Sequence, residues 1–413
     1  MNGNIVIIGG GQGGVQLADS LRIEGWTGAI TLVADELHLP YQRPPLSKDF
    51  MAEHSPGEAL PLRGGQFFLE SVIDFKPGVT ALSIDREAKT VMTDAGEALH
   101  YTSLVFATGA RNRRLDIEGS ELSGIHYLRT LDDATALQAE LGAAKRVVVV
   151  GAGFIGLEFA ASARKRGVEV TVLEFGPRVM GRVLSLPMSD HFAAIHNAAG
   201  IDIRLGQGIA SLSGENGQVT YAIGTDGTMY PADLVVVGIG VLPNDQIAGA
   251  SGISTANGIV VDALLRSSDE SVYALGDCCS FPSTWDGAAI RIESVQNATD
   301  QARALAKTLT GTPTVYRSSP WFWSQQGSSR LQIAGITRAD DDAVLRGDPA
   351  DGRFSIYCFR GDELAGVESV NSPADHLGAR RMLDSRIAVT RQQVADLSFD
   401  LKAHSKSAVA ALS

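Results

Sequence analysis

Two glycine-rich turns stand directly after short apolar runs in this sequence. The apolar runs, Ile5–Ile8 and Val147–Val150, read as buried parallel strands. The glycines that follow share the spacing G-x-G-x-x-G and are Gly9, Gly11 and Gly14 in the first turn and Gly151, Gly153 and Gly156 in the second. At this spacing the first glycine permits a tight turn, the second lets a pyrophosphate approach the backbone, and the third lets a helix pack on the strand.

A single turn of this kind also occurs in α/β proteins that bind no dinucleotide. Here it recurs about one domain length further along the chain, again before a helix-like run. The repetition argues against chance and predicts two separate nucleotide-binding folds.

Composition excludes several classes of protein. Of the 413 residues, 44% are hydrophobic and 20% charged, which is typical of a soluble globular protein of two or three domains. The apolar runs are shorter than the roughly 18 residues of a membrane helix, and the first strand begins so near Met1 that we expect no signal segment. We therefore expect a cytoplasmic protein without a membrane partner. The net charge of −12 argues against a nucleic-acid partner.

The three cysteines, Cys278, Cys279 and Cys358, form no C-x-x-C pair and cannot make a disulfide framework. The adjacent pair could be redox-active, but we favour buried free thiols. Because no cysteine-rich cluster motif is present, we expect the chain to hold no metal centre of its own.

Acidic residues follow the second strand of each expected fold, where a carboxylate commonly accepts a hydrogen bond from a ribose hydroxyl. Asp35 lies just beyond the strand Ala29–Val33, although a solvated turn carboxylate explains it almost as well. Glu174 stands at the end of its strand at the expected distance from the second glycine turn. A carboxylate there repels a 2′-phosphate, so we expect NAD rather than NADP, with Arg178 and Arg182 nearby as weak counter-evidence.

Three further segments have the pattern of a ligand site. Two prolines stiffen Tyr41–Lys48 ahead of its lysine, although an ordinary surface loop would look the same. Leu104–Ala110 is an apolar strand that ends in Ala-Thr-Gly, where glycine often marks close approach of a ligand. Ser271–Asp277 ends in Gly-Asp, whose carboxylate is suited to the ribityl hydroxyls of a flavin, and Leu234–Asn244 reads as one more buried strand.

From Trp321 onward the pattern changes to alternating strand-like segments followed by helical residues, which predicts an antiparallel α+β domain. Taken together, these residues resemble the NADH-dependent ferredoxin reductases that serve cytochrome P450 and aromatic-ring dioxygenase systems, over essentially the whole length. The matching motifs, besides the two glycine turns, are Arg43–Lys48, Ala107–Ala110, Tyr127–Thr130, Phe154–Glu158, Gly276–Asp277, Arg291–Ala298 and Trp321–Ser324.

The resemblance implies two Rossmann-like domains, arranged as in glutathione reductase, and a C-terminal α+β domain. The implied boundaries are 1–112 with 247–320 for FAD, 113–246 for NADH and 321–413 for the C-terminal domain. The implied FAD contacts are Gly9, Gly11, Gly13, Gly14, Asp35, Arg43, Lys48, Val79, Ala107, Thr108, Gly109, Arg129, Gly276, Asp277 and Val295. The implied NADH contacts are Gly151, Gly153, Phe154, Ile155, Gly156 and Glu174.

By the same resemblance, three residues serve the chemistry. Lys48 would lie beside the flavin and pair with Glu158, and Trp323 would lie near the flavin on the ferredoxin side. For Trp321 we favour simple core packing. Gln325 stands where relatives often have aspartate, which puts in doubt any role of that carboxylate.

The resemblance implies that a hydride passes from NADH to FAD and that single electrons then pass to a [2Fe–2S] ferredoxin, which feeds a cytochrome P450 or a ring-hydroxylating dioxygenase. Because ferredoxins are generally acidic like this chain, docking would need a local basic patch. The candidates for this patch are Arg291, Arg303, Arg330 and Arg338. An ordinary role as solvent-exposed arginines accounts for these residues about as well. The oligomeric state is left open as monomer or homodimer.

Two other functions stay open from the sequence. The same architecture serves disulfide reductases, NADH peroxidases and NADH oxidases. Disulfide reductases need a redox cysteine pair and peroxidases need a reactive cysteine near the flavin, and neither feature is evident in the sequence. A redox-controlled flavin-binding signalling protein is the other alternative, and no targeting segment or basic surface supports it.

Overall fold

The computed structural model describes residues 3–52, 61–283, 285 and 287–412, and these residues form two compact units. The first unit combines Met1–Gln42, Glu58–Arg111 and Val241–Pro320, and the second combines Arg43–Gly57, Asn112–Gly240 and Trp321–Ser413, apart from the residues outside the described ranges.

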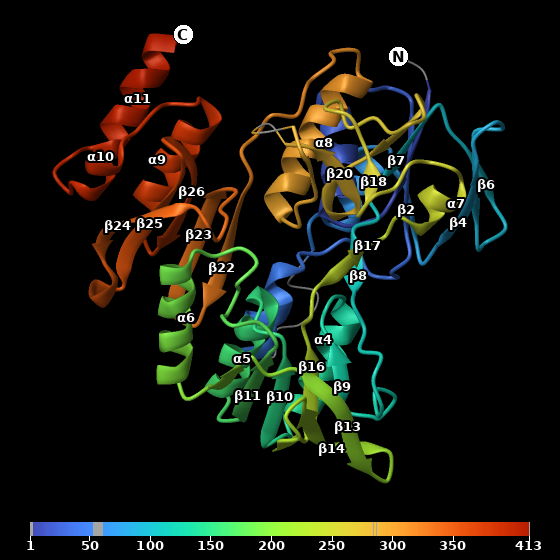
Figure 1. The fold of residues 1–413 in the computed structure, drawn as a ribbon. Helices are drawn as coiled ribbons and strands as arrows, with labels where there is room; N and C mark the ends of the chain where they lie inside the picture. The colour runs from blue at the N-terminus through green and yellow to red at the C-terminus, as the bar shows by residue number, and fades with distance from the viewer. Residues whose placement is uncertain (1–2, 53–60, 284, 286, 413) are drawn as a thin grey trace. The chain divides into compact units, whose positions relative to one another are not determined.

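The first unit is built on a five-stranded parallel sheet in the order β19-β7-β1-β2-β3 (Figure 1). Its strands are β1 (Asn4–Ile8), β2 (Ala29–Ala34), β3 (Asp74–Pro77), β7 (Ser103–Phe106) and β19 (Val272–Ala274). Side chains on both faces of β1 are buried, and the core around it includes residues of helices α1 (Gln12–Ile23) and α8 (Val295–Leu309). Near-continuous apolar runs are what such a sheet requires.

Shorter elements complete the first unit. The antiparallel strands β4, β5 and β6 form one small sheet and β18, β20 and β21 a second mixed one. The bounds of these and the other short elements are β4 (Ala81–Asp85), β5 (Thr90–Thr93), β6 (Ala98–His100), β8 (Ala110–Asn112), β17 (Val241–Pro243), β18 (Ile259–Val260), β20 (Cys279–Pro282), β21 (Ala289–Ile290), α3 (Gly65–Glu70) and α7 (Gln246–Ala250).

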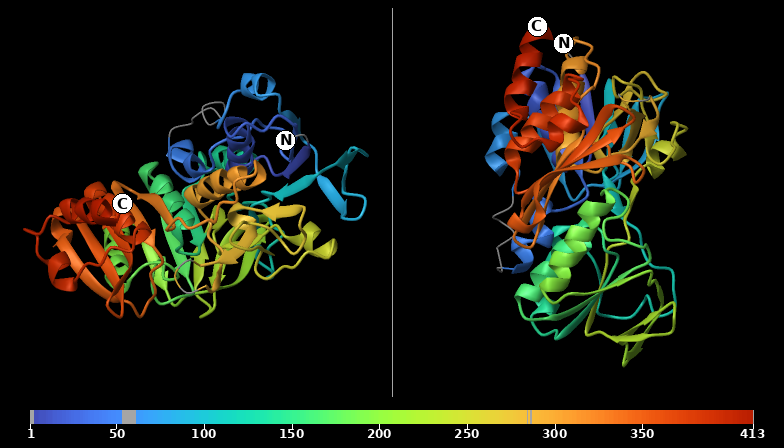
Figure 2. Two further views of the ribbon diagram at one scale, coloured as in Figure 1. Left: turned by 90° about the horizontal axis from the view of Figure 1, so that it is seen from above. Right: turned by 60° about the vertical axis from the view of Figure 1, so that its left-hand side comes forward.

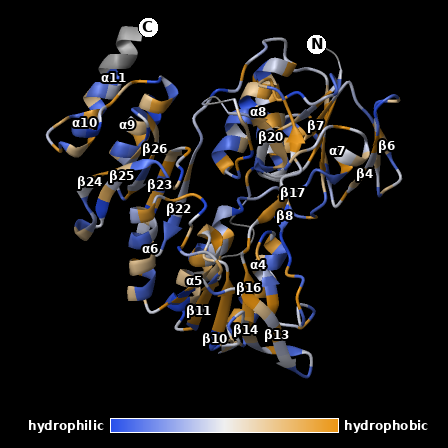
Figure 3. Cartoon of the chain, viewed as in Figure 1, coloured by the Kyte–Doolittle hydropathy of each residue, from blue (hydrophilic) through white to orange (hydrophobic). Residues whose placement is uncertain are grey.

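The second unit contains another five-stranded parallel sheet, in the order β12-β11-β10-β16-β9. Its strands are β9 (Ile125–Tyr127), β10 (Arg146–Val150), β11 (Glu169–Glu174), β12 (Asp202–Leu205) and β16 (Leu234–Val237). Strand β10 is hydrophobic from Val147 to Val150 (Figure 3), and the buried positions of β11 are Val170, Val172 and Leu173. As in the first unit, the strand before the glycine turn lies at the centre of the sheet.

Helices and a small sheet accompany these strands. The elements are η1 (Pro44–Ser47), α2 (Asp49–Ala52), α4 (Leu131–Leu141), α5 (Phe154–Lys165), α6 (Leu186–Ala198), β13 (Ile209–Glu215), β14 (Gln218–Gly224) and β15 (Met229–Pro231). Thr130 caps α4 reciprocally with Asp133, as the capping-box pattern requires.

The C-terminal part of the second unit is an antiparallel sheet in the order β22-β23-β26-β25-β24. Helices α9 to α11 gather on one face of this sheet (Figure 2). The bounds are β22 (Trp321–Gln326), β23 (Ser329–Gly335), β24 (Asp342–Asp348), β25 (Arg353–Arg360), β26 (Glu363–Val370), α9 (Pro373–Asp384), α10 (Arg391–Ala395) and α11 (Leu401–Leu412). Two parallel nucleotide-binding sheets and an antiparallel α+β part confirm the expected fold class.

One expected element is wrong in detail. The sequence predicts a single strand over Leu234–Asn244, but the structure ends β16 at Val237 and begins β17 at Val241. The break falls at Gly238–Gly240, and Gly240 has a φ of 100°, which interrupts a strand as few other residues can.

Candidate functional site

The first glycine turn needs glycine for two different reasons. Gly9 has a φ of 120°, and a Cβ on it would lie 2.2 Å from the carbonyl oxygen of Ala107; a Cβ on Gly14 would lie 2.0 Å from the carbonyl oxygen of Gly9. A Cβ on Gly11 would meet no atom of the described chain within 4 Å. Contacts inside the fold therefore explain Gly9 and Gly14, whereas open space lies before Gly11 at the start of α1.

The second glycine turn repeats this geometry. A Cβ on Gly151, whose φ is 101°, would lie 2.5 Å from the carbonyl oxygen of Gly238, and one on Gly156 would lie 2.3 Å from that of Gly151. On Gly153 the nearest atom would be 3.9 Å away. Free N–H groups at a helix N-terminus favour an anion, so both turns fit the pyrophosphate of a dinucleotide at the second glycine.

The predicted flavin contacts of the first unit follow the carboxyl ends of its parallel strands. Gly9 follows β1, Asp35 follows β2, Val79 comes after β3, Ala107 follows β7 and Asp277 comes after β19. Ligands of open α/β sheets bind along this edge. The fold thus brings together, on one sheet edge, residues that are far apart in the sequence.

Hydrogen bonds hold two of these strand ends in place. Asn244 donates from Nδ2 to the Thr108 carbonyl at 2.9 Å and accepts at its own carbonyl from the Thr108 hydroxyl at 2.6 Å. The backbone N–H of Gly276 donates to Oε1 of Gln301 on α8 at 2.7 Å. Gly109 and Gly276 have positive φ values, while Gly13 packs on Leu275 and Val295 begins α8.

The strand-end acids of the two sheets are not equivalent. Gly9 N donates to the Val33 carbonyl and Gly151 N donates to the Leu173 carbonyl, both at 2.8 Å. The residue after Leu173 is Glu174, whose carboxylate accepts from the backbone N–H groups of Ala152 and Gly176 at 2.7 Å each. The residue after Val33 is Ala34, so Asp35 lies one position further on, where it is exposed.

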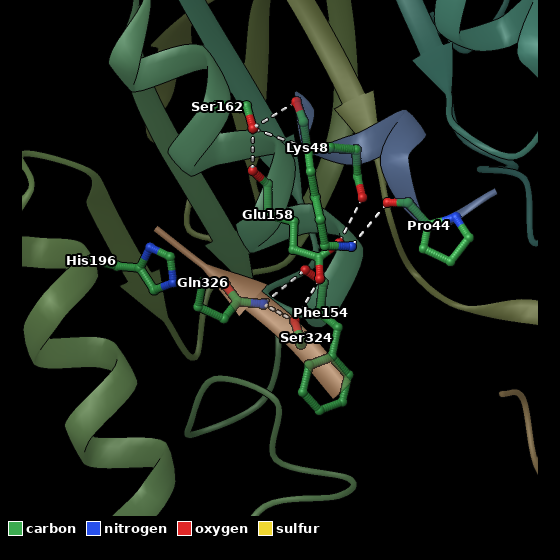
Figure 4. Close-up of polar contacts among 9 residues, drawn as sticks. Pro44, Lys48, Phe154, Glu158, Ser162, His196, Ser324 and Gln326 are labelled. Carbon is green, nitrogen blue, oxygen red and sulfur yellow. Dashed lines mark hydrogen bonds and ion pairs between the residues drawn. The ribbon is translucent and has the colours of Figure 1, made fainter. Parts of the chain in front are cut away.

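Lys48 forms an ion pair with Glu158 within the second unit (Figure 4). The distance from Lys48 Nζ to Glu158 Oε2 is 2.7 Å, and the two side chains are 12% and 4% exposed. Lys48 Nζ also donates to the Pro44 carbonyl at 3.0 Å and lies 5.1 Å from the centre of the Trp323 ring. The three residues expected to serve the chemistry therefore lie together.

Two serines complete the surroundings of the Glu158 carboxylate. Ser47 Oγ donates to Oε2 at 2.6 Å, and Ser324 Oγ donates to Oε1 at 2.5 Å. Ser324 also accepts a hydrogen bond from Gln326 Nε2 at 2.8 Å, and Gln326 Oε1 lies 2.9 Å from Nε2 of the buried His196. Sequence reasoning missed these residues, although Ser47 and Ser324 lie inside two of the quoted motifs.

The other predicted contacts of the second unit are spread around this cluster. Arg43 donates from its guanidinium to the Arg129 carbonyl at 2.6 Å. Phe154 and Ile155 begin α5 after the second glycine turn; the Phe154 ring meets Phe322 edge to face at 4.8 Å, and Ile155 is exposed.

The comparisons with known proteins agree with this geometry. The family model described as pyridine nucleotide-disulphide oxidoreductase matches residues 3–302, and the model described as reductase C-terminal matches residues 321–405. The chain belongs to the pyridine nucleotide-disulphide oxidoreductase family. Family membership confirms the expected enzyme class, an oxidoreductase, and the expected cofactors, FAD and NADH.

Two relatives of the family match almost the whole chain. Rhodocoxin reductase of Rhodococcus erythropolis is 48% identical over 399 residues, covering 97% of this chain and 93% of that protein. Putidaredoxin reductase CamA of Pseudomonas putida is 38% identical over 417 residues, covering 100% and 99%.

Two solved structures of family members have the same fold. The ferredoxin reductase for the CYP199A2 system from Rhodopseudomonas palustris has a TM-score of 0.96 and 46% identity, covering 97% of this chain and 99% of that one. The reductase chain matched in the covalent putidaredoxin reductase–putidaredoxin complex has a TM-score of 0.95 and 37% identity, covering 99% of each chain. These likenesses confirm the predicted resemblance to ferredoxin reductases.

The cysteines of this family member are unsuited to disulfide chemistry. Cys278, Cys279 and Cys358 are buried free thiols, as expected. Burial raises the pKa of all three thiols, which disfavours the reactive thiolate. Among the described helices, none combines the length and the apolar character needed to cross a bilayer.

The arginines proposed for docking differ in availability. Arg291 is 9% exposed, pairs with Glu293 at 2.7 Å and donates to the Asp277 carbonyl, so it is poorly placed to meet a partner. Arg303 is 60% exposed and lies 3.6 Å from Asp300. The Arg330 guanidinium carbon lies 6.0 Å from the centre of the Trp323 ring.

The tryptophans and Gln325 lie on β22. Trp321 is partly exposed; the Arg380 guanidinium carbon lies 4.1 Å from the centre of its ring, so simple core packing describes it only in part. Gln325 donates from Nε2 to the Gly327 carbonyl at 3.0 Å.

Proposed function

We propose that this chain is an NADH-dependent ferredoxin reductase that takes a hydride from NADH onto FAD and passes single electrons to a [2Fe–2S] ferredoxin of a cytochrome P450 or dioxygenase system. The observation that carries the proposal is the pair of glycine turns, each with open space at its second glycine. Two dinucleotide sites and three buried, inactive thiols fit an enzyme that delivers its electrons to an external acceptor. Rhodocoxin reductase and putidaredoxin reductase bear such acceptors in their names.

Bound FAD would supply the chemistry, since a flavin accepts electrons in pairs and releases them singly. The chain's residues would bind and orient. Those that follow β1, β2, β3, β7 and β19 would hold FAD, and Lys48 would place a fixed positive charge where reduced flavin carries negative charge. Glu158 would hold Lys48, and Trp323 would border the flavin on the ferredoxin side.

The second glycine turn with Glu174 would bind NADH. The Glu174 carboxylate is fixed by two backbone N–H groups, and its charge would repel the 2′-phosphate of NADPH. The proposal keeps the domain boundaries that the resemblance implies, residues 113–246 for NADH, 1–112 with 247–320 for FAD and 321–413 for the C-terminal domain, although residues 241–246 belong to the first unit. NADH is a cytoplasmic electron donor, so the proposal places the enzyme in the cytoplasm.

The partner would be an acidic ferredoxin that docks on local basic residues, and the enzyme would act as a monomer or homodimer. We propose Arg303 and Arg330 for this role ahead of Arg291, because the Arg291 side chain is only 9% exposed and is paired with Glu293. The charge reversal Arg303→Glu should weaken electron transfer to ferredoxin and leave NADH–ferricyanide turnover intact. Arg204→Glu is a matched control, because Arg204 is 54% exposed and also pairs with an aspartate. Equal loss of both activities in Arg303→Glu would refute the docking role.

The whole proposal is tested by anaerobic titration of the purified flavoprotein with NADH, followed by addition of a [2Fe–2S] ferredoxin with cytochrome c as terminal acceptor. We expect bleaching of the flavin band near ~450 nm and then ferredoxin-dependent reduction of cytochrome c. Bleaching without ferredoxin-dependent turnover would favour an NADH oxidase or a redox-controlled binding protein instead.

A further inference from the structure

The carboxylate of Glu158 is buried and receives hydrogen bonds from three side chains. Lys48 and Ser47 donate to Oε2, and Ser324 donates to Oε1. Only the lysine was expected as a partner. The two hydroxyl groups come from η1 and β22, segments nearly three hundred residues apart, and both are buried.

Beyond Ser324, hydrogen bonds connect Gln326 with Phe154 and His196 (Figure 4), and their direction is fixed by the amide of Gln326. The Gln326 amide donates from Nε2 to both the Phe154 carbonyl, at 3.2 Å, and Ser324 Oγ. Gln326 Oε1 is therefore the acceptor for His196, whose Nε2 must carry the proton. Burial lowers the pKa of His196, which keeps the ring neutral.

Only one orientation of the Ser324 hydroxyl proton is therefore compatible with both of its hydrogen-bond partners, Gln326 and Glu158. Its oxygen accepts from Gln326, so its single proton is left for Glu158. Every bond from His196 to Glu158 then donates toward the carboxylate, so the series holds Ser324 with its proton on Oε1. The charged carboxylate in turn holds Lys48 Nζ against the Pro44 carbonyl and the Trp323 ring.

We propose that Ser324 and Gln326 are positioning residues for the reductase: they fix the orientation of the Glu158 carboxylate and, through it, the Lys48 ammonium group, which under the proposed function would act on reduced flavin. The inference rests on the proposed function, because Lys48 has that role only in a flavoprotein. It adds two residues that do not touch the reacting groups themselves.

Ser162 provides a matched control. It lies one helical turn after Glu158 on α5 and is buried, but its Oγ lies 3.0, 3.1 and 3.5 Å from the backbone carbonyl oxygens of Glu158, Ser47 and Lys48, so its single proton goes to a carbonyl oxygen. It belongs to the same cluster without donating to the carboxylate. Ser324→Ala and Ser162→Ala therefore remove the same group from similar surroundings.

The experiment measures the flavin midpoint potential and the rate of flavin reduction by NADH in the purified holoenzyme. We expect Ser324→Ala to make the potential more negative and to slow reduction by about tenfold, with an unchanged KM for NADH. Ser162→Ala should match the wild type. Gln326→Met, which keeps the volume but removes the donor to Ser324, should shift both quantities in the same direction and serves if Ser324→Ala does not fold.

A second background separates positioning from packing. If Ser324 acts through Glu158, then once Glu158→Gln is present Ser324→Ala should shift the potential less than it does alone and should change the rate less than twofold, because the effects of interacting residues are not additive. Full additivity in this double variant, or equal effects of Ser162→Ala, would overturn the proposal. An enzyme that NADH bleaches but that reduces no ferredoxin would refute the proposed partner and leave this inference standing, whereas absence of bleaching would refute both.

Discussion

The substitution Gly153→Ala, which adds one methyl group, tests whether this glycine is needed for NADH binding or for folding. Gly153 has φ −78° and ψ 179°, an extended conformation that alanine adopts without strain. Its Cβ would lie 3.9 Å from the nearest atom, the Gly238 carbonyl oxygen, which is ordinary van der Waals contact. The new methyl group would therefore clash with no atom of the described residues, but it would meet the bound pyrophosphate.

The expected magnitudes follow from this geometry. Gly153→Ala should leave the free energy of unfolding unchanged or raise it by up to about 1 kcal/mol, because alanine restricts the unfolded chain. It should weaken NADH binding at least tenfold, or about 1.4 kcal/mol. Gly156→Ala is the contrasting variant, since its Cβ would lie 2.3 Å from the Gly151 carbonyl oxygen; such overpacking costs about 1–3 kcal/mol.

The assay combines thermal unfolding, the flavin-to-protein ratio and the KM for NADH with ferricyanide as acceptor. Gly153→Ala should have a normal melting temperature, normal flavin content and a raised KM, whereas Gly156→Ala should melt early. A destabilised Gly153→Ala with unchanged NADH affinity would refute the reasoning, because it would show that the second glycine serves the fold and not a ligand.

Three further predictions concern other residues. Glu174→Gln should raise kcat/KM for NADPH relative to NADH about tenfold, and an unchanged ratio in steady-state kinetics would contradict the proposed discrimination. Burial raises the pKa of Glu368 to about 7 from its ordinary 4.5, so folding takes up a proton there and this stabilisation is lost as pH rises from about 4.5 to about 7. Chemical denaturation across that range should show Glu368→Gln gaining roughly 1–3 kcal/mol relative to the wild type, and parallel curves would argue against it. The buried Cys278 and Cys279 should react with a thiol reagent only in denaturant, and titration of a native thiol would show that the region opens.

The sequence was informative wherever a local pattern had a single physical cause. A glycine turn after an apolar run has few conformations, and its repetition identified both sheets, with Glu174 at a strand end as expected. The same is true of the C-terminal part, where the alternating segments expected from Trp321 onward form the antiparallel strands β22 to β26. The periodicity of apolar residues and the spacing of glycines depend only on residues close together in the sequence, so these elements could be predicted.

The surroundings of Glu158 could not be predicted in this way. Ser47 on η1 and Ser324 on β22 reach Glu158 because both elements pack on α5. His196 joins them because α6 lies beside β22. No local sequence pattern reports such packing. One signal was present: Ser324 and Gln326 are two residues apart, so on a strand they share a face. Both are buried, while the intervening Gln325 is partly exposed.

The two sheets use one glycine geometry for ligands with different requirements. On the first sheet, predicted cofactor contacts follow all five parallel strands, whereas on the second the glycine turn after β10 and Glu174 at the end of β11 account for most of them. A cofactor that is retained through every turnover needs many contacts, and a substrate that must leave after each hydride transfer needs few. Loss of one contact on the first sheet should therefore lower the flavin content only in part, whereas substitution of Glu174 or Gly153 alone should already change the KM for NADH.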